Sequence, residues 1–191
     1  LRRTQGEPST IYGAVKPLED VGDLRPVERK TIHSNLELIP GDLALSAFED
    51  AVATEWPKAV DTSFRAFRVL TAFSSVVQEA ATAMQADVVV IDVGPNLGSL
   101  NRSVLLGTEF VLVPLAADIF SLQGMRNLGP TLSQWRQGWR KRRDIWNDNR
   151  LTLPPGTMKP VGYVMQQHGT RLDRPTRAYD KWARRIPEEY A

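Results

Sequence analysis

Residues 86–101 read ADVVVIDVGPNLGSLN, and this stretch predicts the class of fold. The run from Val88 to Ile91 is apolar at every position, without the alternation of a strand that has one face in water. A continuous apolar run is typical of strands in parallel sheets that are covered by helices on both faces. We therefore predict a buried strand over 87–92 that ends on the carboxylate of Asp92 and leads into a Gly-Pro loop.

The flanking sequence alternates between helical and strand-like patterns. Hydrophobic residues recur every three or four positions through 63–85 and 121–143, as in amphipathic helices. We expect helices at 11–15, 43–56, 63–85, 100–107, 121–143 and 171–186, and strands at 36–40, 87–92, 109–115 and 160–165. Pro130 should kink or split the longest helix. This order predicts an α/β fold, with a doubly wound, mostly parallel sheet and helices on both faces.

Length and composition favour one domain over 1–191, with mostly loop over 1–35 and a core over 36–186. The absence of cysteine excludes disulfides, thiolate metal sites and a cysteine nucleophile, and fits a cytoplasmic protein. No window approaches the roughly 18 apolar residues of a membrane span. The formal net charge is only +2, so any binding of nucleic acid depends on local clusters of charge.

Asp92 lies at the position where α/β proteins have their binding sites, because ligands bind outside the carboxyl ends of parallel strands. A buried carboxylate needs a partner, and Mg²⁺ with a nucleotide phosphate supplies one. An apolar strand ending in such an aspartate is a Walker B pattern. Gly94 and Pro95 then suit a switch loop that responds to a γ-phosphate. The alternative is that Asp92 only forms a turn and caps the next helix.

The wider segment 86–132 resembles the Walker B strand, and the strand and helix after it, of the ParA/MinD family of partitioning ATPases. The positions that match are Asp92, Pro95, Leu97-Gly98, Pro114 and the FSLQG stretch at 120–124. Upstream, NLELIPGDLALSAFE at 35–49 resembles another family strand, and 159–182 occupies the place of the strand and loop that hold the adenine. The resemblance covers about 31–186 and implies a fold like that of P-loop NTPases.

This resemblance implies an ATPase that uses ATP and Mg²⁺. Asp92 would be the catalytic residue and would organise Mg²⁺ through water, with Gly94 and Pro95 beside the nucleotide. Gln166 and Gln167 stand where the family often has Asn at the adenine. The intact protein would form an ATP-dependent homodimer, bind DNA non-specifically and work with a ParB-like partner in chromosome or plasmid partitioning. Its expected location is the bacterial cytoplasm, in association with the nucleoid.

One family element is absent from the sequence, namely the phosphate-binding loop. None of the 13 glycines is followed by Lys, as the G-x-x-x-x-G-K-[ST] loop requires. The chain also begins with Leu1, so we expect the strand, loop and helix that the family places earlier to belong to a longer protein. Without them we expect exposed strand edges, no tightly bound nucleotide and no ATP hydrolysis by this chain. The alternatives are a non-catalytic platform for DNA or a partner, and a related positioning ATPase.

Two basic stretches are candidates for DNA binding. They contribute Arg136, Arg140, Lys141, Arg142 and Arg143 from 136–144, and Arg174 and Arg177 from 171–185. Contacts of this kind depend on charge at the phosphates and weaken steeply with salt. The alternative is that these residues solvate a helix face and complement the helix dipole.

Overall fold

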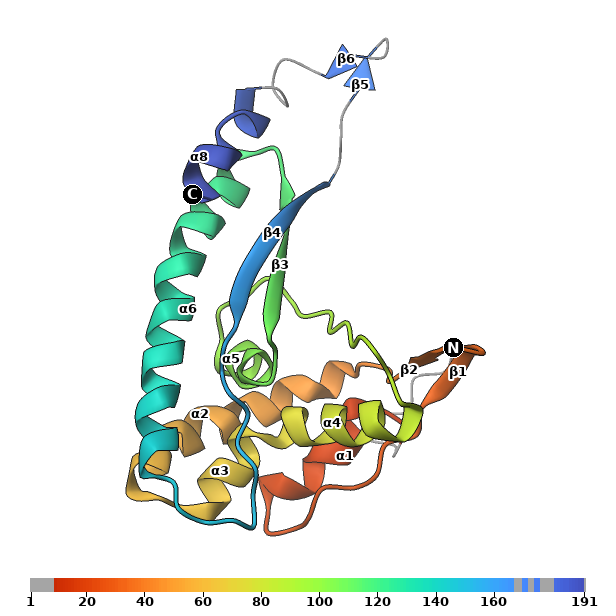
Figure 1. Cartoon of the computed structure of the whole chain (residues 1–191), viewed down its shortest axis with the longest axis vertical. Coiled ribbons are helices and arrows are strands. Elements are labelled where there is room, and N and C mark those ends of the chain that lie inside the picture. The colour runs from red at the N-terminus through yellow and green to blue at the C-terminus, as the bar shows by residue number, and fades with distance from the viewer. Residues whose placement is uncertain (1–8, 167–169, 172–173, 176–180, 191) are drawn as a thin grey trace. The chain divides into compact units, whose positions relative to one another are not determined.

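The computed structural model describes residues 9–166, 170–171, 174–175 and 181–190 (Figure 1). The chain divides into two compact units, which are described separately. The first unit comprises Leu1–Thr108 and Trp139–Gly156, and the second comprises Glu109–Gly138 and Thr157–Ala191. Two compact units can belong to one domain or to two. The single domain expected over 1–191 therefore stays a prediction.

The first unit is mainly helical. Its elements are α1 (Ile11–Val15), η1 (Lys16–Glu19), β1 (Lys30–His33), β2 (Leu36–Leu38), η2 (Leu43–Ala47), α2 (Phe48–Lys58), η3 (Ala59–Asp61), α3 (Phe64–Leu70), α4 (Ala72–Met84) and α5 (Ser99–Leu106), where η marks a 3-10 helix. Polar side chains cap the N-termini of three of these helices, α1, η2 and α3, as their residue types predict. Asp42 accepts a hydrogen bond from the Ala44 amide at 2.9 Å, and Ser63 accepts one from the Ala66 amide at 3.3 Å.

The helix expected at 11–15 is α1, and the region 1–35 also contains η1 and β1. Two features of this unit differ from the expectations. The strand expected at 36–40 is β2, which pairs with β1 in an antiparallel hairpin and not in a parallel sheet. The helix expected over 63–85 is divided into α3 and α4 at Thr71, whose hydroxyl donates to the Phe67 carbonyl at 2.8 Å. Such back-bonding often bends helices.

The core of the first unit is aromatic. Phe67 and Trp139 are fully buried, and their rings lie 6.0 Å apart. The Trp139 indole N–H donates to the Pro154 carbonyl at 2.9 Å, so its polar atom is satisfied inside the core. Phe48 of α2 and Phe73 of α4 meet edge to face at 5.7 Å. These contacts bring α2, α3, α4 and the last turns of α6 (Ile119–Ile145) together.

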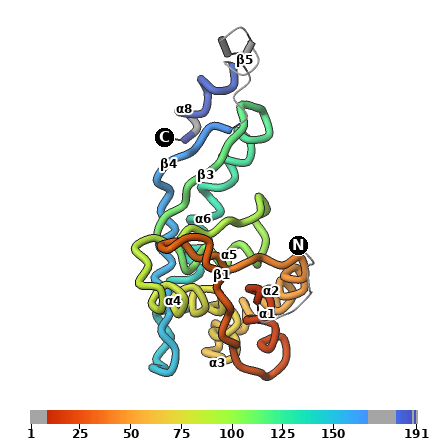
Figure 2. Tube along the Cα trace, turned by 90° about the vertical axis from the view of Figure 1, so that its right-hand side faces the viewer, coloured from red at the N-terminus to blue at the C-terminus, as the bar shows by residue number. Residues whose placement is uncertain are grey.

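The second unit contains the parallel pair β3 (Phe110–Ala116) and β4 (Lys159–Gln166), which lie side by side in Figures 1 and 2. Its other elements are the first part of α6 (Ile119–Ile145), the short strands β5 (Thr170–Arg171) and β6 (Arg174–Pro175), and α8 (Ile186–Tyr190). A small core of Leu115, Leu122, Met125 and Ile186 joins these helices to β3. The parallel pair and its helices agree with the predicted α/β class.

Two predictions about helices need correction here. Pro130 does not split α6, which is assigned as one helix through that position. The single basic helix expected over 171–186 is wrong, because β5 and β6 form an antiparallel pair within that range. A physical reason is Pro175, since a proline disfavours helical backbone at the residue before it.

The largest departure concerns the strand predicted over 87–92. Residues 86–97 carry no strand assignment and run as an extended trace between α4 and α5 (Figure 1). Val88 and Val90 are 77% and 88% exposed. A strand requires a hydrogen-bonded neighbour, and the strand pairs among the described residues do not include this segment. The apolar pattern is therefore present in the sequence, but the segment has no strand partner among the described residues.

Candidate functional site

The candidate site is the loop from Asp92 to Gly98, which we call the 92–98 loop. Asp92, Gly94 and Pro95 are all exposed, so the carboxylate faces solvent and not a buried pocket. No group of three His, Cys, Asp or Glu side chains suited to a metal occurs in the part of the chain that the structure describes. A single exposed carboxylate fits Mg²⁺, which keeps several waters and takes its other ligands from phosphates.

Asn101, in the first turn of α5, holds the middle of the 92–98 loop. Its Nδ2 atom donates to the carbonyl oxygens of Gly94 and Asn96, at 2.6 and 2.7 Å. An amide nitrogen has two hydrogens, so both are used on the loop. The residue is only 5% exposed, and its amide therefore depends on these two acceptors.

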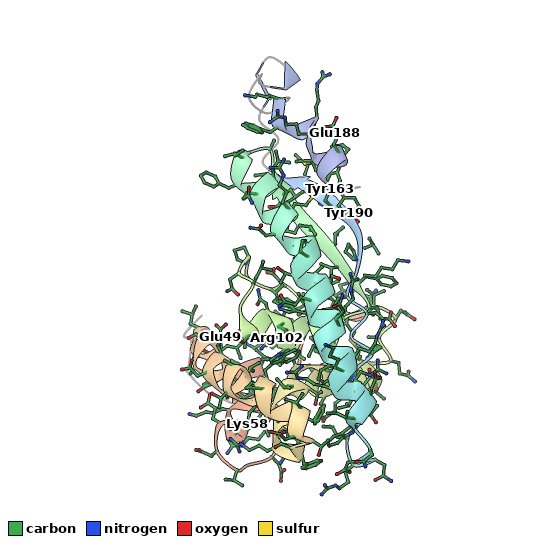
Figure 3. All side chains as sticks on the ribbon, turned by 90° about the vertical axis from the view of Figure 1, so that its left-hand side faces the viewer. Glu49, Lys58, Arg102, Tyr163, Glu188 and Tyr190 are labelled. Carbon is green, nitrogen blue, oxygen red and sulfur yellow. The ribbon has the colours of Figure 1, made fainter. Side chains whose placement is uncertain are left out.

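Glu49, near the start of α2, holds the end of the loop. One of its carboxylate oxygens, Oε1, accepts a hydrogen bond from the Ser99 amide at 2.9 Å. The first amides of a helix have no partner within the helix, and a carboxylate there also complements the helix dipole. Gly98 makes room for this contact, because a Cβ atom at that position would lie 2.2 Å from Glu49 Oε1. Figure 3 labels Glu49 on α2 and Arg102 on the neighbouring α5.

Two arginines stack on one tryptophan beside this helix. The guanidinium carbons of Arg102 in α5 and Arg142 in α6 lie 3.9 and 4.0 Å from the Trp56 ring centroid. Arg142 also donates twice to the Trp56 carbonyl, from Nε at 3.0 Å and from Nη2 at 2.9 Å. Burial, and after it the charge of Arg142, lowers the pKa of Arg102 to about 10. Burial also lowers the pKa of Arg142.

Arg142 needs a correction as a candidate DNA-binding residue. It is only 9% exposed and its guanidinium is bound to Trp56, so in this structure it is not part of the exposed basic surface. The sequence did contain the signal. Arg142 follows Leu132, Trp135 and Trp139 at helical spacing, and therefore continues their buried stripe.

The other candidate residues lie in the first unit, in the second unit or outside the described residues. Arg140, Lys141 and Arg143 are exposed in the first unit's part of α6, and Arg143 donates to the Pro155 carbonyl at 2.8 Å. Arg136 is half-buried in the second unit, and Gln166 is exposed at the end of β4. Arg174 belongs to β6, whereas Gln167 and Arg177 lie outside the described residues.

Sequence reasoning missed Asn101 and Glu49. Asn101 could have been noticed as a poor helix former in the first turn of a short helix, directly after a Gly-Pro loop. Glu49 gives no such signal, because its contact with Ser99 joins residues 50 positions apart in the chain.

Comparison with known proteins identifies the family. A family model described as an AAA domain matches residues 5–145. The chain is 27% identical over 132 residues to the chromosome partitioning protein ParA of Myxococcus xanthus. The aligned region covers 68% of this chain and 40% of ParA. It is 31% identical over 109 residues to the cell division protein PomZ of the same species. That aligned region covers 57% of this chain and 30% of PomZ.

A third relative is a putative replication protein A of Rhizobium rhizogenes, 32% identical over 126 residues, with 63% of this chain and 28% of that protein covered. The chain thus spans less than half the length of these curated relatives.

The fold is also that of a solved structure. Protein DIP2308 from Corynebacterium diphtheriae superposes with a TM-score of 0.72 at 22% identity, over 96% of this chain and 64% of that one. This likeness confirms the α/β fold class. Within the described ranges, none of the helices combines the length and the apolar character needed to cross a bilayer. Together the family model and the relatives show that the chain belongs to the ParA-like family of AAA-domain proteins.

Proposed function

We propose that this chain supplies the Walker B aspartate and the switch loop of a ParA-like ATPase that partitions or positions DNA or another cargo. The observation that carries the proposal is the 92–98 loop. It begins with an exposed carboxylate at Asp92, and side chains from α2 and α5 hold the backbone that follows. An ATPase of this kind needs a metal-organising aspartate followed by a loop of defined geometry.

In this proposal the nucleotide is ATP with Mg²⁺, and Asp92 holds the ion through a bound water. The metal neutralises charge on the phosphates when bound. Gly94 and Pro95 would lie beside the phosphates, and the family resemblance assigns contact with the base to Gln166. The phosphate-binding Gly-Lys pair does not occur in these 191 residues, so we propose hydrolysis for the full-length protein and none for this chain alone.

The proposal includes a homodimer, non-specific binding of DNA and a ParB-like partner, in the bacterial cytoplasm. Support for DNA binding comes from Arg140, Lys141 and Arg143, which are exposed within four consecutive positions of α6. Contacts of these side chains to phosphates would be independent of base sequence and sensitive to salt.

The test is ATP turnover by the full-length protein encoded by this gene. We expect Asp92→Asn to abolish turnover, because the amide cannot carry the charge that organises Mg²⁺. Asp87→Asn is the matched control, since it removes an exposed carboxylate from the same segment and should leave the rate unchanged. Equal rates in the two variants would contradict the role of Asp92. A wild type that binds DNA without ATP turnover would favour a non-catalytic platform.

A further inference from the structure

We propose that Asn101 is a positioning residue of the ATPase reaction, acting through the backbone of the 92–98 loop; this inference rests on the proposed function. Its amide joins the carbonyl oxygens of Gly94 and Asn96, the residues on either side of Pro95. We call this pair of hydrogen bonds the Asn101 clamp. Its first acceptor, Gly94, is two residues beyond Asp92, and both acceptors lie within the segment proposed to face the γ-phosphate.

The clamp fixes the flexible part of the loop. Proline already fixes its own φ angle, whereas glycine allows many conformations. Gly94 is therefore the joint at which the backbone between Asp92 and Pro95 can turn. A hydrogen bond to the Gly94 carbonyl removes that freedom, and the second bond, to Asn96, ties the far side of Pro95 to the same amide.

The helix that carries Asn101 is itself held in place by a contact with α2. Asn101 belongs to α5, whose first amide is held by Glu49 of α2 through the 2.9 Å hydrogen bond to Ser99. Asn96 adds a local contact, since its Oδ1 atom accepts from the Gly98 amide at 3.0 Å. The loop is thus tied at its middle to α5 and at its end to α2.

The two hydrogen bonds of the Asn101 clamp fix the conformation of the 92–98 loop more than they raise the free energy of unfolding. Gly94 and Asn96 are exposed, so water can satisfy their carbonyls when the clamp is absent. Their conformation would then vary, and small misplacements of a catalytic group can lower a rate by about 10- to 100-fold. Binding of nucleotide through other contacts would change little. We therefore expect a loss in kcat with a nucleotide Kd that changes by less than about 3-fold.

The test uses the full-length protein with Asn101→Asp, which keeps the shape but places a carboxylate without hydrogens against two carbonyl oxygens. Asn101→Ala is the second variant, because it removes the donor without adding charge. The matched control is Ser103→Ala in the same helix. Ser103 is 1% exposed and donates to the Leu70 carbonyl at 2.8 Å, so its loss removes a buried hydrogen bond that does not reach the loop.

Two readouts are required, kcat with nucleotide Kd, and amide hydrogen exchange of residues 93–99. The proposal expects faster exchange and a kcat lower by about 10-fold or more in both Asn101 variants, with neither change in Ser103→Ala. It is overturned if the Asn101 variants that fold match Ser103→Ala in either readout. A wild type without ATP turnover would instead refute the proposed function. Faster hydrogen exchange of the loop in the Asn101 variants would then show that the clamp orders the loop without a catalytic role.

Discussion

Replacing Arg142 with alanine should destabilise the first unit although the residue is an arginine on a strongly basic helix. The side chain makes two charge-assisted hydrogen bonds to the Trp56 carbonyl and stacks on the Trp56 ring at 4.0 Å. Hydrogen bonds to charged groups contribute about 1.5–3 kcal/mol, and a desolvated cation–π contact adds about 1–2 kcal/mol. Removing Arg142 also relieves its repulsion of Arg102 and the cost of burying a charge, which offsets part of this sum.

The expected loss in the free energy of unfolding is therefore about 2–4 kcal/mol. It can be measured by urea denaturation followed through tryptophan fluorescence. Arg140→Ala is the matched control, because Arg140 is exposed two positions earlier, and its change should stay within about 0.5 kcal/mol. Arg142→Met should fall between the two, since it keeps the buried aliphatic stem. Equal unfolding free energies for Arg142→Ala and Arg140→Ala would refute the assignment of Arg142 as a structural side chain.

Two further predictions concern the loop and the basic surface. Gly98→Ala should displace the Glu49 carboxylate and cost about 1–2 kcal/mol, as Glu49→Ala should, because each removes the cap on the Ser99 amide. The double variant should be no less stable than either single variant by urea denaturation, and additive losses would contradict this contact. Replacing Arg140, Lys141 and Arg143 with glutamine in the full-length protein should weaken DNA binding and flatten its salt dependence in fluorescence anisotropy. An unchanged salt slope would exclude this surface.

Local sequence patterns predicted most helices and both parallel strands. The stripe through Leu122, Leu132 and Trp139 and the apolar runs at 109–115 and 160–165 are local signals, and α6, β3 and β4 lie where they indicated. The Walker B resemblance also led to the correct family. In each case a few neighbouring residues contain all the information that the prediction needed.

The remaining features depend on residues far apart in the chain. Strand pairing over 87–92 requires a neighbour, which no pattern within that segment can supply. The contact between Glu49 and Ser99 joins two helices, so neither sequence window predicts it. The charge of Arg142 favours an exposed position, whereas its place in the buried stripe after Trp139 puts it in the core. The composition of 171–186 favours a basic helix, but Pro175 disfavours helical backbone within it, and β5 pairs there with β6.

The central claim is that Asp92 organises Mg²⁺ for a nucleotide, and the most direct measurement is the Mg²⁺ dependence of ATP binding. Isothermal titration of ATP into the full-length protein, at several Mg²⁺ concentrations, should show an affinity that rises with Mg²⁺. In Asp92→Asn this dependence should be largely lost, whereas Asp87→Asn should behave as wild type. The same Mg²⁺ dependence in Asp92→Asn as in wild type would contradict the account.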